Sequence, residues 1–253
     1  MPPFLTEAVI LRLGEFQERD LLVTFYGDQK GKMTAVAKGA KASRRRFGAN
    51  LDLLSYVRVI GFERSSNSLA RMEGADLLEH FPWVRENLAG FARACYLAEW
   101  VDGCAPERQP VPGLLPLVLW TLRSFGKGRA EESALRLFEL RALDLAGYGP
   151  ALDRCVVCGS KLGDRLFVSV DVARGGALCG HCAHGSGIRI SKGTVRLLQE
   201  ARSLPLERLH RIAFSSLALR ESRELMGSFF TYHVGRELRS CEFMKSMGAW
   251  ARS

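Results

Sequence analysis

The sequence predicts an α+β protein in which a small N-terminal β-barrel or sandwich precedes a mainly α-helical domain with a four-cysteine, zinc-ribbon-like insertion. Three observations predict this fold class. Five short β-rich runs occupy the first eighty residues, a helical period of apolar residues begins near Trp83, and two Cys-x-x-Cys pairs interrupt the helical part. We therefore expect one domain at residues 1–80, a second at 81–253, and the insertion at 153–184.

The N-terminal runs alternate as strands do. In "EAVILRL", Val9, Leu11 and Leu13 share one face; "DLLVTFY" and "KMTAVAK" follow, joined by a turn at "GDQKG". The runs "LLSYVRVIGF" and "LARMEGADLLEH" complete the set. Five such runs indicate a small barrel or sandwich, and by themselves they leave an SH3-like barrel open beside the OB type.

Helical periodicity then takes over. The segments 84–103, 112–125 and 131–150 each carry an apolar stripe, and the third is the clearest because Gly147 and Pro150 terminate it. Ser191 is a suitable N-cap for a helix over the following dozen residues. A last long helix is expected from about Ser216 to Cys241.

The stretch from Cys155 to Cys182 contains four of the seven cysteines. A disulfide framework, a redox dithiol and a metal site are the three alternatives. The N-terminus lacks the basic start of a secretory signal, so we expect a cytoplasmic protein, and reducing conditions disfavour disulfides. A redox dithiol needs a thioredoxin-like βαβ context, whereas the residues between the two pairs, "RLFVSVDV" and "GGALC", resemble a short hairpin.

Paired spacing therefore favours a metal. Two tight turns let four thiolates converge on one cation, which is the ligand pattern of a zinc ribbon. We expect one structural zinc per chain, held by Cys155, Cys158, Cys179 and Cys182. Four protein ligands close the site, so the metal is not expected to be catalytic. The imidazoles of His181 and His184 are alternative ligands that we expect to be solvated.

The net charge is +9, and its distribution is uneven. Residues 189–253 carry 12 basic and 6 acidic side chains, and one early segment carries seven cations without an acid. A flexible solvated loop is the plain interpretation of that segment, but its position after a β-hairpin of a barrel favours phosphate binding. The candidate nucleic-acid contacts are Lys30, Lys32, Lys38, Lys41, Arg44, Arg45 and Arg46. Phe47, at the end of the segment, is expected to anchor in the barrel core.

Catalytic motifs are missing from the sequence. It has no phosphate-binding P-loop, no nucleophile elbow and no His-Glu-x-x-His, so we expect a protein that is not an enzyme. It also has no run of the roughly 18 apolar residues that a membrane-spanning helix needs.

The run "EAVILRLGEFQERDLLVTFYGDQKGKMTAVAKGAKASRRRFGANLDLL" resembles the start of bacterial RecO recombination-mediator proteins, and the order of barrel, helices, cysteine pairs and helices resembles that family throughout. The resemblance implies an N-terminal OB-type β-barrel, a mainly α-helical C-terminal domain and a zinc-binding insertion. It also implies binding of single- and double-stranded DNA, annealing of complementary strands without ATP, and partnership with RecR and single-stranded-DNA-binding protein to help load RecA on gapped DNA. It also implies work at the nucleoid. A zinc-ribbon nucleic-acid-binding module for transcription or protein interaction is the alternative.

Overall fold

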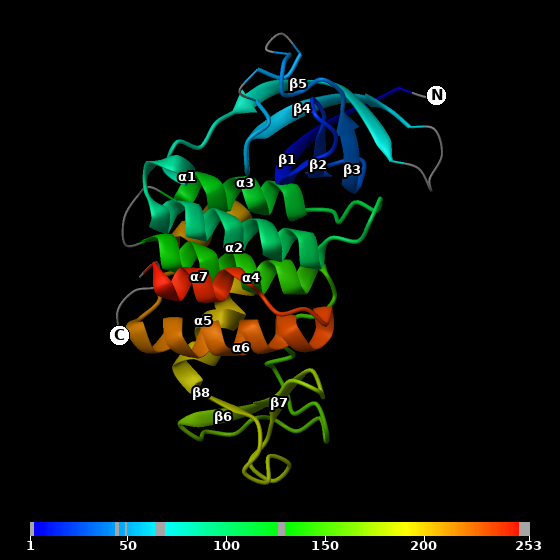
Figure 1. The fold of residues 1–253 in the computed structure, drawn as a ribbon. Coiled ribbons are helices and arrows are strands. Elements are labelled where there is room, and N and C mark those ends of the chain that lie inside the picture. The colour runs from blue at the N-terminus through cyan, green and yellow to red at the C-terminus, as the bar shows by residue number, and fades with distance from the viewer. Residues whose placement is uncertain (1–2, 44–45, 49, 64–68, 126–129, 248–253) are drawn as a thin grey trace. The chain divides into compact units, whose positions relative to one another are not determined.

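The computed structural model describes residues 3–43, 46–48, 50–63, 69–125 and 130–247 (Figure 1). Packing divides the chain into two compact units, one of residues 1–116 with 239–249 and the other of residues 117–238 with 250–253. The first unit contains the N-terminal strands together with helices that follow residue 80, and the domain boundary expected at that residue stays a prediction.

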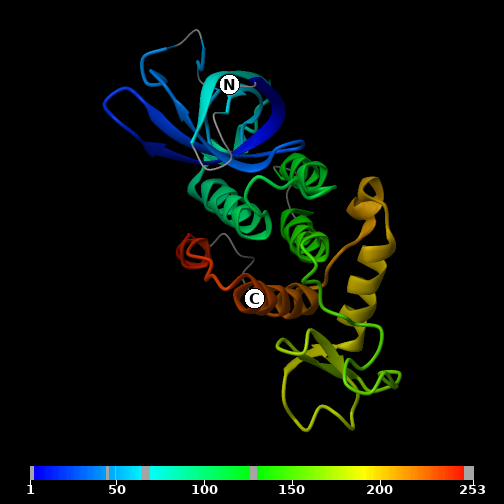
Figure 2. The ribbon, with the colours of Figure 1, turned by 90° about the vertical axis from the view of Figure 1, so that its right-hand side faces the viewer.

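Five strands form the N-terminal sheet, and their pairings close it into a ring. The strands are β1 (Pro3–Glu15), β2 (Leu21–Gly27), β3 (Gly31–Ala37), β4 (Tyr56–Phe62) and β5 (Ala70–Glu79). Their order is β1-β2-β3-β5-β4, with β4 returning to β1, and β3–β5 is the parallel pair among them. This OB-like arrangement, followed by helices and a cysteine-containing insertion, confirms the predicted fold class (Figures 1 and 2).

The barrel core is built from alternate strand residues, as the period of two requires. In β1 the residues in the core cluster are Phe4, Ala8 and Ile10; Val9, Leu11 and Leu13, which were expected to share one face, are not part of it. Val9 is nevertheless fully buried and Leu13 is exposed, and β1 also contacts helix α2 (Leu88–Cys104). The pairing of β1 with β2 shifts register between Ile10 and Arg12, so the alternation of the strand is interrupted there. A strand that is covered on both faces does not show a simple alternation of apolar and polar residues.

Three helices accompany the barrel in the first unit: α1 (Trp83–Glu86), α2 and α7 (Ser240–Ser246). The Asn87 side chain caps α2 by accepting from the amide of Gly90 at 2.7 Å. The Glu99 carboxylate of α2 accepts from the amides of Arg239 and Ser240, and Phe91 meets Phe243 edge to face. These contacts attach α7 to α2.

A buried lysine connects the barrel to the segment after α2. Lys32 of β3 is 7% exposed, and its Nζ donates to the carbonyl oxygen of Asp102 at 2.6 Å. The carboxylates of Asp102 and Glu107 lie 3.2 and 3.3 Å from the same nitrogen. Nearby, the Tyr26 hydroxyl donates to the carbonyl and accepts from the amide of Val111. The sequence between α2 and residue 111 is therefore held against the β2–β3 hairpin.

The second unit contains α4 (Ala130–Leu145), α5 (Lys192–Ser203), the 3-10 helix η1 (Leu206–Arg211) and α6 (Ser216–Val234), together with most of α3 (Leu114–Ser124). The Ser191 hydroxyl caps α5 by accepting from the Thr194 amide at 3.2 Å, which confirms the predicted cap. The helix expected to reach Cys241 ends earlier. Gly235 adopts a φ of +70°, which stops α6 in a left-handed cap, and α7 begins afresh.

A three-stranded sheet forms the insertion and extends beyond it. Strands β6 (Phe167–Asp171) and β7 (Gly176–Leu178) make the hairpin predicted between the cysteine pairs. Strand β8 (Ile188–Ser191), which the sequence did not suggest, pairs with the other side of β6 to give the order β7-β6-β8. The sheet therefore includes residues that follow the last cysteine and lead directly into α5.

Replacing Lys32 by Ala is expected to destabilise the first unit by about 2 kcal/mol, because it removes charge-assisted hydrogen bonds and takes this cation away from the part-buried Asp102 carboxylate. Urea unfolding followed by tryptophan fluorescence measures the change. Lys38→Ala, at an exposed lysine just after β3, is the matched control and should stay within about 0.5 kcal/mol of the parent. Equal stability of both variants would contradict the role given to Lys32.

Candidate metal centre and nucleic-acid interface

The four predicted cysteines come together in the insertion. The Sγ atoms of Cys155, Cys158, Cys179 and Cys182 all lie within 4.8 Å of one another. Those of Cys158 and Cys179 are 3.6 Å apart. Four thiolates around one zinc at about 2.3 Å have sulfurs about 3.8 Å apart, so the cluster has the dimensions of a tetrahedral site. The residues present therefore fit a zinc ion.

Each cysteine pair lies on a tight turn held by backbone hydrogen bonds. In the first turn, Gly159 N donates to Cys155 O at 2.9 Å, and the φ of +73° at Gly159 suits a residue without a side chain. In the second, Cys182 N donates to Cys179 O at 3.1 Å. Val156 N donates to Ala177 O of β7, which fixes the first turn beside the second. The hairpin thus brings the turns together, as its sequence suggested.

Thiol acidities within the cluster differ. A hydrogen bond with the Ser160 side chain and backbone amides lower the pKa of Cys179 to about 5. Hydrogen bonds from the Cys179 and Cys158 backbone amides also lower the pKa of Cys155, whereas side-chain hydrogen bonds to Cys158 and Cys179 raise the pKa of Cys182 to about 12. Amide donors stabilise thiolates, the form that binds metal. The two imidazoles considered as alternative ligands, His181 and His184, are exposed. The atoms close enough together to hold a metal ion are the four cysteine sulfurs.

The predicted nucleic-acid contacts of the N-terminal segment lie in different environments. Lys38, Lys41 and Arg46 are exposed, on the loop between β3 and β4. Lys30 lies before β3, 3.8 Å from the Glu63 carboxylate and over the Phe4 ring. Lys32 is the buried lysine that contacts Asp102, so its charge does not face solvent. Arg44 and Arg45 lie outside the described residues.

We call the segment from Lys38 to Phe47 the basic loop. Both of its ends are attached to the barrel. At its start, Gly39 N donates to the Asp20 carboxylate at 2.8 Å, and Lys41 N donates to Arg19 O at 3.2 Å. These bonds bring the exposed Arg19, on the β1–β2 connection, beside the loop. Sequence reasoning missed Arg19 because it follows Glu18 and precedes Asp20 in a locally acidic stretch, where nothing indicates a contact with the loop.

The far end of the loop is held by Arg46 and Phe47. The Arg46 guanidinium donates to Lys38 O at 2.8 Å and lies over the Phe47 ring, 5.3 Å from its centroid. Phe47 is 1% exposed and belongs to the barrel core cluster, which confirms the predicted anchor. Arg46 therefore has a structural role in addition to its charge.

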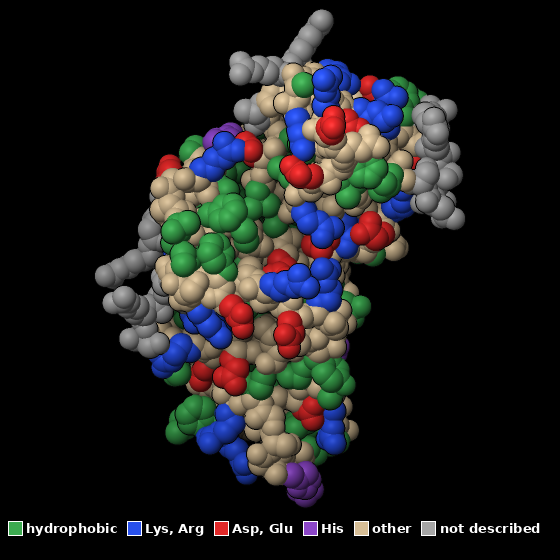
Figure 3. All heavy atoms as spheres, viewed as in Figure 1, with side chains coloured by type: hydrophobic (Ala, Val, Ile, Leu, Met, Phe, Trp, Pro, Cys, Tyr) green, Lys and Arg blue, Asp and Glu red, His purple; other side chains and the backbone are tan. Residues whose placement is uncertain are grey.

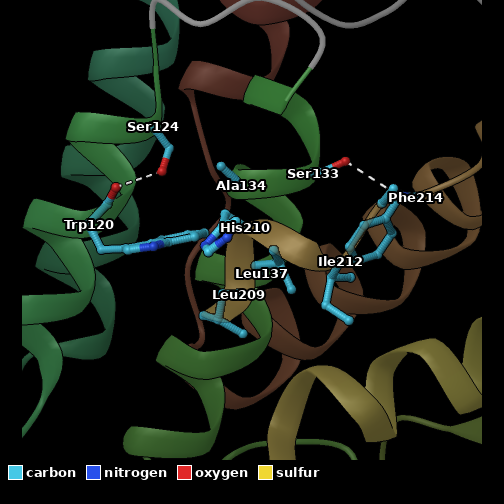
Figure 4. A pocket seen from close by; sticks show the side chains of 10 residues that line it. Trp120, Ser124, Ser133, Ala134, Leu137, Leu209, His210, Ile212 and Phe214 are labelled. Carbon is cyan, nitrogen blue, oxygen red and sulfur yellow. Dashed lines mark hydrogen bonds between the residues drawn. The ribbon is translucent and has the colours of Figure 1, made fainter. Parts of the chain in front are cut away.

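A separate pocket of about 390 Å³ lies in the second unit (Figure 4). It is lined by Trp120, Ser124, Ser133, Ala134, Leu137, Leu209, His210, Ile212, Ala213 and Phe214. The Ser124 hydroxyl donates to Trp120 O, Ser133 Oγ accepts from the Phe214 amide, and a ring nitrogen of His210 contacts Glu207 O. These polar groups already have partners within the chain, so the lining offers mainly apolar surface.

Comparison with known proteins agrees with the order of these modules. Sequence models of the N-terminal and C-terminal parts of recombination protein O match residues 1–81 and 85–242. The chain belongs to the RecO family. The DNA repair protein RecO of Syntrophus aciditrophicus is 34% identical over 94% of both chains, and that of Desulfatibacillum aliphaticivorans is 34% identical over 98% of both. A RecO of Pelotomaculum thermopropionicum is 32% identical over 98% of this chain and 96% of its own.

Replacing Cys179 and Cys182 together by Ala is expected to remove bound metal, because two thiolates cannot complete a tetrahedral zinc site. Elemental analysis of protein purified without chelator should give about one zinc per parent chain and almost none for the variant. Cys95→Ala, outside the cluster, is the control and should retain the metal. A parent protein with no metal and four freely titrating thiols would contradict the assignment.

Proposed function

We propose that this protein is a DNA-binding recombination mediator in recombinational repair. It binds single- and double-stranded DNA, anneals complementary strands without ATP, and acts with RecR and single-stranded-DNA-binding protein to help load RecA on gapped DNA. The observation that carries the proposal is the basic loop pinned on an OB-like barrel. Membership of a family whose relatives bear the name DNA repair protein supports it.

The loop has the chemistry of a phosphate-binding surface. Lys38, Lys41 and Arg46 are exposed on it, Arg19 lies beside it, and Arg44 and Arg45 add charge in the sequence. Phosphates carry no base identity, so such a surface binds DNA of any sequence. Attachment of the loop at both ends lowers the entropy lost when it orders on a ligand.

The four-cysteine site bears on whether the protein is an enzyme. We propose that it is not an enzyme and that the zinc is structural, since four thiolates would leave no open position for water or substrate. We also place its work at the nucleoid in the cytoplasm. None of the helices in the described residues is long and apolar enough to cross a membrane.

Replacing Lys38, Lys41, Arg44 and Arg45 by Ala is expected to weaken DNA binding similarly for all sequences. Arg46 is left in place because its guanidinium holds the loop. On single strands each lost phosphate contact lowers the salt slope by about 0.7, so the slope should fall by up to about 2.8. Fluorescence anisotropy with oligonucleotides at several salt concentrations measures both quantities.

The matched control removes four exposed cations elsewhere, Arg208, Arg211, Arg220 and Lys245. It has the same net charge as the loop variant and should keep most of the affinity. If the two variants lose affinity equally, total charge rather than the loop governs binding. Full affinity and slope in the loop variant would place the DNA surface elsewhere on the chain.

Annealing of complementary single strands should be accelerated without any nucleotide. A basic surface lowers the repulsion between phosphates, and two of them, the loop and the excess of positive charge after residue 189, would raise the effective concentration of one strand near the other. Pairing of two labelled oligonucleotides, followed by fluorescence with and without ATP and magnesium, measures the rate. The acceleration should decline with salt. Strict dependence on ATP, or no acceleration by protein that binds both strands, would refute this activity.

A further inference from the structure

Strand β8 adds cationic residues to the zinc-bearing sheet. The sequence between the cysteines is almost neutral in charge, but β8 continues the sheet past the last cysteine and leads into α5. Arg189 of β8 and Lys192 and Arg196 at the start of α5 therefore lie beside the insertion. Together with Phe167 of β6 we call them the β6–β8 platform. Over β6 in Figure 3, basic and hydrophobic side chains lie side by side on the visible face, with acidic side chains above them.

The platform lies on the solvent side of the sheet. Phe167 pairs with Ser191 and Ser169 with Arg189, so Phe167 and Arg189 occupy diagonal positions on one face. On the opposite face Val168 and Ile190 are buried. The Arg189 guanidinium lies 4.9 Å from the centroid of the Phe167 ring, which is 44% exposed, and Leu166 beside it is 80% exposed. An exposed aromatic ring with an arginine over it is therefore held on a strand rather than on a mobile loop.

Positive charge dominates this surface. Asp164 beside it already pairs with Lys192, whose hydrogen bond lowers the pKa of that carboxyl group, and the charge of Arg196 adds to the shift. The nearby Glu221 carboxylate is buried and accepts from the Ser191 amide and hydroxyl and from the Thr194 hydroxyl. Arg189 and Arg196 are exposed. Their charges have the sign that attracts a phosphate backbone.

We propose that the β6–β8 platform is a second binding site for single-stranded nucleic acid, in which a base stacks on the Phe167–Arg189 pair and Arg189 and Arg196 face the phosphates. This inference rests on the proposed function, because annealing needs a site for each strand. Single strands fit better than a duplex, since unpaired bases can stack on aromatic rings or guanidinium planes and paired bases cannot.

The metal centre borders this platform and helps to position it. The core of the zinc turns, which includes Cys155, Cys179 and Leu178, packs at the β7 side of the same sheet. The guanidinium of Arg165, two residues before Phe167, lies against Gly180 of the second turn. Lys192 N also donates to Leu166 O at 2.9 Å. The approach to Phe167 is thus bounded by the zinc turn on one side and by α5 on the other.

Photocrosslinking tests the aromatic contact directly. A thymine-rich single strand carrying 5-iodouracil is irradiated with the full chain, and the digest with trypsin is examined by mass spectrometry. Cleavage after Arg165 and Arg174 releases residues 166–174, the peptide that contains Phe167. We expect an adduct on this peptide that Phe167→Leu removes. Tyr232→Leu, at a 58% exposed aromatic residue of α6, is the matched control and should leave the adduct in place.

Salt dependence tests the cations. In the background of the loop variant, Arg189→Ala with Arg196→Ala should lower the remaining single-strand slope by about 1.4, two contacts at about 0.7 each. Phe167→Leu should weaken binding about tenfold there, within the range for loss of one base stack, with little change in slope. The control pair is Arg208→Ala with Arg211→Ala, two exposed arginines of the same unit, and should change the slope little.

The outcomes separate this proposal from the broader one. A chain that binds the oligonucleotide but gives no adduct on residues 166–174, or an unchanged slope in the Arg189/Arg196 variant, overturns the platform and leaves the DNA-binding function intact. Equal loss of duplex and single-strand affinity in Phe167→Leu also overturns it, because stacking requires unpaired bases. A chain that binds no DNA at low salt would refute the proposed function itself.

Discussion

The position of the basic loop depends on the backbone of one strand, β5. Strand β3 pairs with β5 only from Ala70 to Met72, and among the described strands none continues on that side. Backbone amides and carbonyls inside a fold need partners. The segment after β3 supplies them, because Ala75 N donates to Arg46 O and the Asn50 side chain donates to Ala75 O. The segment that pairs with the backbone of β5 at this edge of the barrel is therefore the same segment that carries the cations.

This constraint explains how the cations that follow β3, from Lys38 to Arg46, come to lie in one segment that stays folded. The buried Phe47 and the β5 contacts hold the far end of the loop, and the Asp20 carboxylate holds its start at Gly39. Between these two anchors Lys41 is exposed. Lys32 differs from its neighbours in sequence because its strand position points it at Asp102 and Glu107 instead of solvent.

The sequence predicted the features that depend on local pattern. Paired cysteine spacing identified the four thiolates that meet, and alternation with turn residues identified the five strands. It could not distinguish Lys32 from Lys38, since a lysine in a basic run looks the same whether a distant carboxylate buries it or water surrounds it. Strand β8 was missed for a similar reason: four residues, "IRIS", become a strand through pairing with β6. The burial of Lys32 and the formation of β8 both depend on contacts with residues far away in the sequence.

The two proposed surfaces differ in a way that suits two different strands. On the loop, the aromatic residue Phe47 is buried, so a bound strand would be held through its phosphates and its bases would stay free to pair. On the platform, Phe167 is exposed and a stacked base must leave the ring before it can pair. The loop is therefore the better site for presenting a strand, and the platform for retaining one. Since base pairing and stacking in the duplex compete with the ring, annealing itself would release the retained strand, and no covalent step or nucleotide hydrolysis would be needed for turnover.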